Sequence, residues 1–214
     1  LAGLVFGAML AAVFGVQAGT LLEIPGDVKL GNRQSKVLSF PGVDSAKGRI
    51  VVDFQYRIDY PRAAGWCPCW QIEVNGKTIN IVTLHTWPQA YAYKAEDRNA
   101  SKAENGGDKY RAREIKYICE NTIGTVENAS EQLWMMMGDF NSRSRLDNDQ
   151  YGYAEDDTRL LVHNYVLDNT PYIDVIKSKH PEGFIPSVGA KNSRIDFVYC
   201  TKPLYDRVIA ADII

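Results

Sequence analysis

Apolar and polar residues alternate most clearly around one dipeptide in the first half of the chain. Two runs rich in β-branched residues, "CWQIEV" and "KTINIVTLH", flank Asn75-Gly76. Alternation is typical of strands with one buried face, and Asn-Gly is favoured in two-residue hairpin turns because both positions accept a positive φ. The pattern predicts a β-hairpin whose second strand ends at His85.

A second run is apolar without alternation. It reads "QLWMMMGDFN" over residues 132–141, and it is short enough for a strand buried on both faces. Gly138 allows the chain to turn sharply as the strand leaves the core. Further strands are predicted at residues 36–40, at 49–58 and within "SRIDFVYCTKPL" and "RVIAADII".

Helical spacing of apolar residues marks residues 108–122. Ala112, Ile115 and Cys119 fall on one face there, so the stretch predicts an amphipathic helix. Asp108 is placed to cap its N-terminus, since a short acidic side chain can accept a hydrogen bond from the first free N–H groups.

Two more helices are predicted further on. One covers residues 158–168, and another starts at Thr170-Pro171, with Thr as the cap and Pro in the first turn. Residues 88–108 and 142–158 are polar and predict surface loops. The order of strands and helices, without repeats, predicts a single α/β (α+β) domain over residues 1–214. This length and a hydrophobic content of 45% are enough for one sizeable core.

The first eighteen residues, "LAGLVFGAMLAAVFGVQA", carry no charge. Glycines divide them into two apolar pieces, which suits a short buried helix followed by a strand. An uncharged segment that ends in a small residue also resembles a clipped secretory signal or an anchor, although this one has no Met start and no basic region. The two interpretations, a buried part of the core and a secretory signal or anchor, both stay open. A secreted or periplasmic localisation therefore stays open as well.

Charge and cysteine content narrow the function only slightly. A net charge of -2 gives no general field that would attract DNA or RNA, so any polyanion contact has to come from a local cluster of Arg and Lys. Cys67 and Cys69 have poor spacing for zinc, which wants four convergent ligands. With Cys119 and Cys200, they are expected to be ordinary buried thiols, and a disulfide is neither supported nor excluded.

Three strand ends carry side chains suited to chemistry: His85, then Asp139 and Asn141, then Asp196. Scaffolds present site residues where a strand meets a loop, so we expect these ends to converge. In an extended chain, Asp139 and Asn141 point to the same side, where they can orient a water and a phosphate oxygen or bind a hard cation. The alternative is an Asx turn that only ends the strand.

The histidines and the last aspartate also have plainer explanations. His85 taken alone fits a polar residue at a strand end. Asp196 is expected to need a buried partner such as a histidine or a cation. His163 and His180 are expected at the surface or as helix caps.

Two arginines follow the Gly-Asp-Phe-Asn turn at once. Arg143 and Arg145 can bind substrate phosphates, since a guanidinium pairs with two phosphate oxygens. The alternative is that both are solvated loop charges paired with Asp147, Asp156 or Asp157. The sequence leaves this choice open.

Taken together, these motifs resemble a known superfamily. "INIVTLHTW", "MMMGDFNS" and "SRIDFVY" occur in this order. From about residue 8 onward the chain is similar to the endonuclease/exonuclease/phosphatase superfamily, in particular to bacterial members, which share the DNase I-like fold. The resemblance implies a four-layer sandwich, in which two mostly antiparallel β-sheets pack face to face with helices outside.

The resemblance also implies roles for single residues. Asp139 matches the aspartate that positions or deprotonates the attacking water, and Asn141 the asparagine that holds the scissile phosphate. His85 matches the histidine that donates to a phosphate oxygen, and Asp196 the aspartate that orients a catalytic histidine. Mg²⁺ or Mn²⁺ is the implied cofactor, with Asp139 and Asn141 among its ligands.

The chain departs from the family pattern towards both ends. The family's first strand supplies an asparagine, the next a glutamate in a Gln-Glu pair, and the last a Ser-Asp-His motif. None of these is found, and Asp212 is not followed by histidine. We therefore expect a domain that is incomplete at its N- and C-termini, with negligible activity in these 214 residues alone.

The expected function is a metal-dependent phosphoesterase that hydrolyses phosphodiesters, as a nuclease does. A phosphomonoesterase or a sphingomyelinase-like phospholipase on the same fold is the alternative enzyme, and a non-catalytic binding protein that kept the fold is the alternative class. The substrate would be a phosphoester in a nucleic acid, an inositol phosphate or a phospholipid head group. No stable protein partner is implied, so a monomer is expected.

Overall fold

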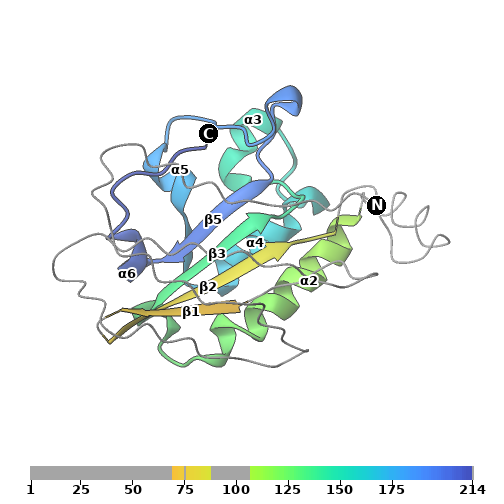
Figure 1. The fold of residues 1–214 in the computed structure, drawn as a ribbon. Coiled ribbons are helices and arrows are strands. Elements are labelled where there is room, and N and C mark those ends of the chain that lie inside the picture. The colour runs from red at the N-terminus through yellow and green to blue at the C-terminus, as the bar shows by residue number, and fades with distance from the viewer. Residues whose placement is uncertain (1–68, 75, 88–106, 214) are drawn as a thin grey trace, which may run out of the picture. The chain divides into compact units, whose positions relative to one another are not determined.

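One mixed sheet of five strands organises the part of the chain that the structure describes (Figure 1). The structure is a computed structural model, and it describes residues 69–74, 76–87 and 107–213. The strand order is β1-β2-β3-β5-β4. The strands are β1 Cys69–Val74, β2 Lys77–His85, β3 Leu133–Asp139, β4 Tyr172–Asp174 and β5 Asp196–Thr201. The α/β fold is therefore confirmed, whereas the second sheet is not seen among these residues.

The predicted hairpin is confirmed. β1 and β2 pair in antiparallel register from Cys69 opposite Val82 to Val74 opposite Lys77. Gly76 has a φ of 70°, the left-handed conformation that such a turn requires. β2 ends at His85, as predicted.

β2 and β3 run parallel, and β3 and β5 run antiparallel. Parallel neighbours need a long crossover connection, usually helical, and α2 (Asp108–Glu120) lies in this one. Because β3 is the central strand, its C-terminal end lies between the C-terminal end of β2 and the N-terminal end of β5. This places the ends that carry the predicted site residues at one edge of the sheet.

Helices α2 and α4 (Leu161–Asn169) cover one face of the sheet. Val82 and Met136 from the sheet pack there with Ile115 and Val166, all at 0% exposure. The shorter helices are α3 Asn148–Tyr151, α5 Val175–Lys179 and α6 Lys202–Tyr205, with 3-10 turns at Ile123–Thr125, Ala129–Glu131, Arg145–Asp147, Thr158–Leu160 and Gly189–Lys191.

The opposite face of the sheet is covered less completely. Ile79, Met135 and Val198 are half-buried there and pack against Leu204 of α6 and against Val208. Burial along β3 therefore alternates, although its sequence does not. The prediction of a strand fully buried on both faces is wrong for the described residues, because only the face under α2 and α4 is closed.

The first two predicted helices are confirmed with corrections. The helix predicted at 158–168 is a 3-10 turn followed by α4. In α2, Asp108 is not the cap. Gly107 holds that position in a left-handed conformation without a side-chain cap, and Asp108 is the first helical residue. Its carboxylate instead accepts a hydrogen bond from Arg111 one turn on.

The helix predicted at Thr170-Pro171 is wrong. The Thr170 hydroxyl donates to the Val166 carbonyl of the preceding helix, 2.7 Å away, and the next residues form β4, which pairs with β5. Helix α5 begins only after Asp174, whose carboxylate caps it by accepting the Lys177 N–H at 3.0 Å. This segment is a strand because it pairs with β5, a partner that the local sequence does not reveal.

Two other segments differ from expectation. Residues 208–213 form no strand, because Val208 and Ala211 pack onto the open face of the sheet instead of pairing at its edge. The predicted loop 142–158 contains a 3-10 turn and α3. Strands predicted at 36–40 and 49–58, and most of the loop predicted at 88–108, lie outside the described residues, as do the first eighteen residues.

Among the described helices, none has both the length and the apolar character that crossing a bilayer requires.

Candidate active site at one edge of the sheet

His85, Asp139 and Asp196 lie in one row across three neighbouring strands. His85 is the register partner of Asp139 in the parallel pair, and Asp139 is the partner of Asp196 in the antiparallel pair. Neighbouring strands are about 4.8 Å apart, and register partners project to the same face. The convergence expected from three separate motifs is therefore present in the backbone pairing.

His85 and Asp139 approach each other most closely. The distance from His85 Nε2 to Asp139 Oδ2 is 3.5 Å. The histidine side chain is 53% exposed and the aspartate 19%. The imidazole thus stands at the solvent side of a carboxylate that is largely withdrawn from water.

The turn after β3 is an Asx turn. The Asn141 N–H donates to Asp139 Oδ1 at 2.7 Å, and Asn141 has a φ of 47°, which asparagine tolerates better than most residues. The expectation that Asp139 and Asn141 share one side of an extended chain is wrong, because the chain turns here. The Asn141 amide is instead held by donating to the Thr86 carbonyl at 3.2 Å.

Phe140 anchors this turn. Its side chain is fully buried, and its ring lies 5.6 Å from the rings of Phe197 and Tyr199 in edge-on contacts. Its N–H donates to the Ile195 carbonyl at 2.8 Å. The tip of β3 is thereby fixed to the chain that enters β5.

Burial raises the pKa of Asp139 above the ordinary carboxyl range. The nearby charge of Asp196 acts in the same direction, whereas the Asn141 N–H, His85 and Arg111 act against it. The two neighbouring carboxylates thus favour a proton or a cation at this point. A raised pKa brings a carboxylate closer to the range that suits a general base near neutral pH.

Asp196 is held by its main chain. Its N–H and that of Ile195 both donate to the Ser187 hydroxyl, at 3.1 and 3.0 Å. The buried histidine or cation expected as its partner is not found in the described ranges, where Asp139 is its register partner in the sheet. Its carboxylate therefore adds negative charge to the row.

The two arginines after the turn differ. Arg145 forms a two-pronged ion pair with Asp168 of α4, at 2.8 and 2.6 Å. Arg143 lies over the ring of Tyr151, 5.6 Å from its centroid, and its Nη1 is buried without a hydrogen bond to any described residue. The alternative partners Asp147, Asp156 and Asp157 are wrong for both, and Arg143 has a buried donor that no described residue uses.

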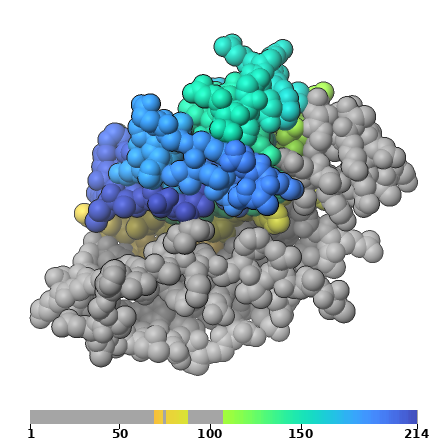
Figure 2. All heavy atoms as spheres, turned by 90° about the horizontal axis from the view of Figure 1, so that it is seen from above, coloured from red at the N-terminus to blue at the C-terminus, as the bar shows by residue number. Residues whose placement is uncertain are grey.

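Arg194 is a functional candidate that sequence reasoning missed. Its side chain is 1% exposed and donates to two buried carboxylates. Nη1 and Nη2 bind Asp174 at 2.9 and 2.7 Å, and Nε binds Asp147 at 2.8 Å. Its N–H donates to the Tyr151 hydroxyl. Figure 2 shows the segment around α3 lying against the blue C-terminal part of the chain. The signal was its place in the "SRIDF" motif, two residues before Asp196.

His163 was expected at the surface and is fully buried, which makes that prediction wrong. Its Nδ1 lies 2.7 Å from the Tyr199 hydroxyl, and its ring centroid is 4.0 Å from that of Phe197. Burial lowers the pKa of His163 well below 6.5, and the charge of Arg194 acts in the same direction. His180 follows the end of α5 as its C-cap residue, as expected.

Three of the four cysteines lie in the part of the chain that the structure describes. Cys119 and Cys200 are buried, as expected, whereas Cys69 is exposed, which corrects that part of the prediction. Burial raises the pKa of Cys119 to about 12 and that of Cys200 to about 11. Both are therefore inert thiols. Cys67 lies outside the described residues.

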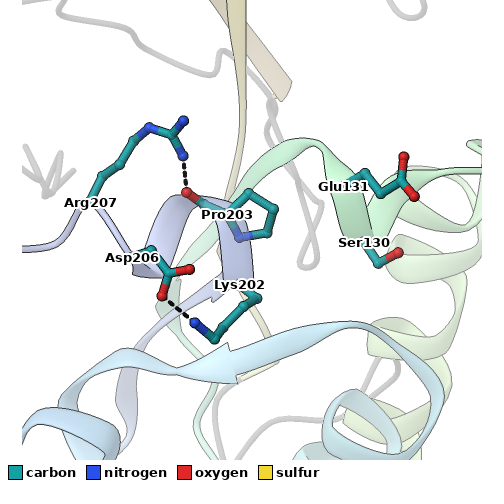
Figure 3. Close-up of a pocket in the computed structure, with 6 residues that line it drawn as sticks. All are labelled: Ser130, Glu131, Lys202, Pro203, Asp206 and Arg207. Carbon is teal, nitrogen blue, oxygen red and sulfur yellow. Dashed lines mark hydrogen bonds and ion pairs between the residues drawn. The ribbon is translucent and has the colours of Figure 1, made fainter.

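A surface hollow of about 700 Å³ lies at the opposite end of the strands (Figure 3). The charged side chains of α6 and of the turn that follows already bind within that segment. Lys202 pairs with Asp206, and Arg207 donates to the Pro203 carbonyl. The hollow is lined by Ser130, Glu131, Lys202, Pro203, Asp206 and Arg207, and no predicted site residue contributes to it.

The oxygen donors of the row suit a hard cation in type, although no group of three or more His, Cys, Asp or Glu side chains in the described ranges is arranged as a metal site. Asp139, Asn141 and Asp196 offer carboxylate and amide oxygens, which Mg²⁺ and Mn²⁺ accept. A cation would also offset the repulsion between the two carboxylates.

Comparison with known proteins identifies no family: no protein-family model matches the chain, and no curated protein matches it significantly.

Proposed function

We propose that this chain carries part of the active site of a metal-dependent phosphoesterase that hydrolyses phosphodiesters. One observation carries the proposal: His85, Asp139 and Asp196, taken from three separate motifs, are register partners on three adjacent strands. Asn141 joins the row through its hydrogen bond to Asp139. A histidine, two carboxylates and an amide at one strand edge are the groups that phosphoryl transfer to water requires.

The residues divide the chemistry between them. The Asp139 carboxylate accepts a proton as a water oxygen forms a bond to phosphorus and the bond to the leaving oxygen breaks. His85, exposed beside it, donates to a phosphate oxygen and stabilises the charge that develops there. The Asn141 amide orients the phosphate. Each role follows from the atoms that the side chain presents at the edge of the sheet.

A divalent cation would supply Lewis-acid stabilisation of the phosphate and of the leaving oxygen. Asp139 and Asn141 are the residues we propose to hold it, and Asp196 adds negative charge that would favour its binding. Mg²⁺ is the expected ion and Mn²⁺ its substitute, because both accept oxygen ligands.

Arg143 is the substrate-binding arginine of this proposal. Its guanidinium follows Asn141 closely in the chain, lies over Tyr151 and keeps a buried donor unused by the described residues. Arg145 is already engaged by Asp168. Because a guanidinium binds phosphate oxygens in pairs, we expect Arg143 to contribute to phosphate binding and Arg145 to contribute little.

The finer fold belongs to the proposal as well. Ile79, Met135 and Val198 leave the second face of the sheet only half-buried, and an apolar sheet face is normally closed by another layer. A second, mostly antiparallel sheet packed on this face would complete the four-layer sandwich. The row of site residues projects to the same face, since β-strand side chains alternate.

The deciding experiment combines metal binding and hydrolysis. Mn²⁺ added to the chain should broaden the NMR signals of His85, Asp139 and Asn141, and Asp139→Asn should abolish this broadening. Asp206→Asn, at the other end of the sheet, is the matched control and should change nothing. Broadening that is centred elsewhere, or that survives in Asp139→Asn, would contradict the site.

Hydrolysis separates the candidate functions. Bis(p-nitrophenyl) phosphate, p-nitrophenyl phosphate, DNA, RNA, inositol phosphates and sphingomyelin would each be incubated with the protein and Mg²⁺. Cleavage of diesters that is lost in Asp139→Asn supports the phosphodiesterase, and preferential cleavage of the monoesters supports a phosphomonoesterase. Sphingomyelin as the sole substrate supports the phospholipase. Metal binding without any turnover is the result expected of these 214 residues alone and also of a non-catalytic binding protein.

A further inference from the structure

Both polar main-chain groups of Trp87 are held by one helix. The Trp87 N–H donates to Glu114 Oε2 at 3.2 Å, and Arg111 Nη1 donates to the Trp87 carbonyl at 3.2 Å. The two side chains are one turn apart on α2 and so share a face. Trp87 lies just past the end of β2, where the sheet no longer pairs its backbone groups, and α2 takes over that task.

The preceding residue is held by the site itself. The Thr86 N–H donates to the Asp139 carbonyl at 2.9 Å, and the Asn141 side-chain amide donates to the Thr86 carbonyl at 3.2 Å. Thr86 is 1% exposed. The orientation of the Asn141 amide thus depends on where the Thr86 carbonyl points, and that carbonyl belongs to the peptide group whose N–H is the one bound by Glu114.

We infer that Arg111 and Glu114 are positioning residues of the proposed site. By holding the main chain at Trp87, they fix the Thr86 carbonyl, which in turn orients the amide of Asn141. The inference rests on the proposed function only for what Asn141 does there. The hydrogen bonds that carry it do not depend on that role.

The surroundings of the two side chains fit a rigid support. Arg111 is 1% exposed and also binds Asp108 at 2.6 Å, so its guanidinium has a fixed orientation. Burial raises the pKa of Glu114 to about 7, while the Trp87 N–H and Arg111 act against it. Both groups are therefore largely removed from water, where a hydrogen bond is stronger than at the surface.

The test observes Asn141 directly, without substrate or metal. In a ¹⁵N-labelled protein, Glu114→Ala should raise the hydrogen-exchange rate of the Trp87 amide about tenfold, since loss of one such bond is worth about 1.4 kcal/mol. The side-chain NH₂ signals of Asn141 should shift and broaden at the same time. Glu114→Gln keeps an acceptor oxygen and should restore both readouts.

Two further variants complete the design. Arg111→Met combined with Asp108→Asn removes the buried pair together, which avoids leaving an unpaired carboxylate, and should also shift the Asn141 signals. Arg113→Ala, an exposed arginine over the Tyr110 ring on the same helix, is the control and should leave them unchanged. The Met136 amide in the core of β3 reports whether the fold is intact.

One result would overturn the inference: faster exchange at Trp87 with unchanged Asn141 side-chain signals in Glu114→Ala. The contact would then support only the end of β2. This outcome is distinguishable from failure of the proposed function, because a protein that binds no Mn²⁺ and cleaves no phosphoester can still show the coupling between Glu114 and Asn141.

Discussion

Charged side chains gather at both ends of the sheet, but the two ends hold them differently. At the end with the row, Asp139 is 19% exposed and Arg194 is 1% exposed, and their partners come from distant segments. At the other end, Lys202 and Asp206 are 66% and 54% exposed and pair within one helical turn. Only the first arrangement holds ionisable groups away from water. Strongly perturbed pKa values, which are common at functional sites, are found in such surroundings.

The comparison also shows that the surface hollow near α6 does not coincide with the candidate active site. The hollow near α6 is lined by charged residues, yet its Lys202 is already paired with Asp206 (Figure 3). The row has two neighbouring carboxylates and an exposed histidine. The predictions below test this difference between the ends in order of decreasing effect.

Removal of the buried cation next to the row should have the largest effect. Arg194→Met leaves Asp147 and Asp174 buried without their guanidinium, so the free energy of unfolding should fall by about 3–5 kcal/mol. Denaturant unfolding followed by circular dichroism measures this. Arg145→Met, which removes an exposed pair with Asp168, is the control and should cost about 1 kcal/mol or less. Equal losses in both variants would contradict the distinction between buried and exposed pairs.

A methyl group at Gly138 should have the next largest effect. A Cβ there would lie 1.9 Å from the Leu84 carbonyl oxygen, and the residue has a φ of 141°. Gly138→Ala should therefore lower the free energy of unfolding by roughly 3 kcal/mol and weaken the β2–β3 pairing. Gly152→Ala meets the strain of a φ of 65° but has no atom within 4 Å. A thermal melt should show it less destabilised, and the reverse order would refute the close-approach explanation.

The buried His163 should make the free energy of unfolding depend on pH. Below pH 6.5 the unfolded chain protonates His163, whereas the folded protein resists this because burial lowers the pKa. The unfolded state then binds more protons, so stability falls as the pH falls, by up to about 1.4 kcal/mol per pH unit. Urea titrations between pH 7 and 5 should show a shallower slope for His163→Gln. An unchanged slope would exclude His163 as the cause.

The smallest effect is expected at the other end of the sheet, in α6. Lys202→Ala should change the free energy of unfolding by about 0.5 kcal/mol or less, because the pair with Asp206 is exposed and spaced i,i+4. Its Mn²⁺ broadening at His85 and Asn141 should equal that of the unmodified protein. A loss above 2 kcal/mol would mean that this end contributes far more to stability than its exposure suggests.

Local patterns predicted much of the fold correctly. The hairpin at Asn75-Gly76, the helix from Asp108, and the strands ending at Asp139 and beginning at Asp196 all follow from spacing and turn chemistry. The helix expected at Thr170-Pro171 failed because β4 has a partner in β5. Pairing across the sheet is not encoded in the local sequence, so local signals could not decide that segment.

The candidate site, like the fold, was predicted from the sequence only in part. Strand ends identified His85, Asp139 and Asp196, and the structure places them in one row. The buried ion pairs of Arg194 and Arg111 were not predicted. The sequence around an arginine does not show whether its guanidinium is solvated or paired. At Asn141 the sequence left an extended chain and an Asx turn both open, because the two share the same residue types, and the structure has the turn.

The parallel pairing of β2 with β3 also constrains when the row can form. Thr86 and Asp139, which are hydrogen-bonded, are 53 residues apart, and contacts between such distant segments slow folding. During synthesis, which proceeds from the N-terminus, β2 and β3 emerge well before β5. The Asp139 carboxylate therefore meets Asp196 only after β5, the last of the described strands, has been synthesised. We expect a nascent chain to hold most of its helical core before it can bring the two carboxylates together.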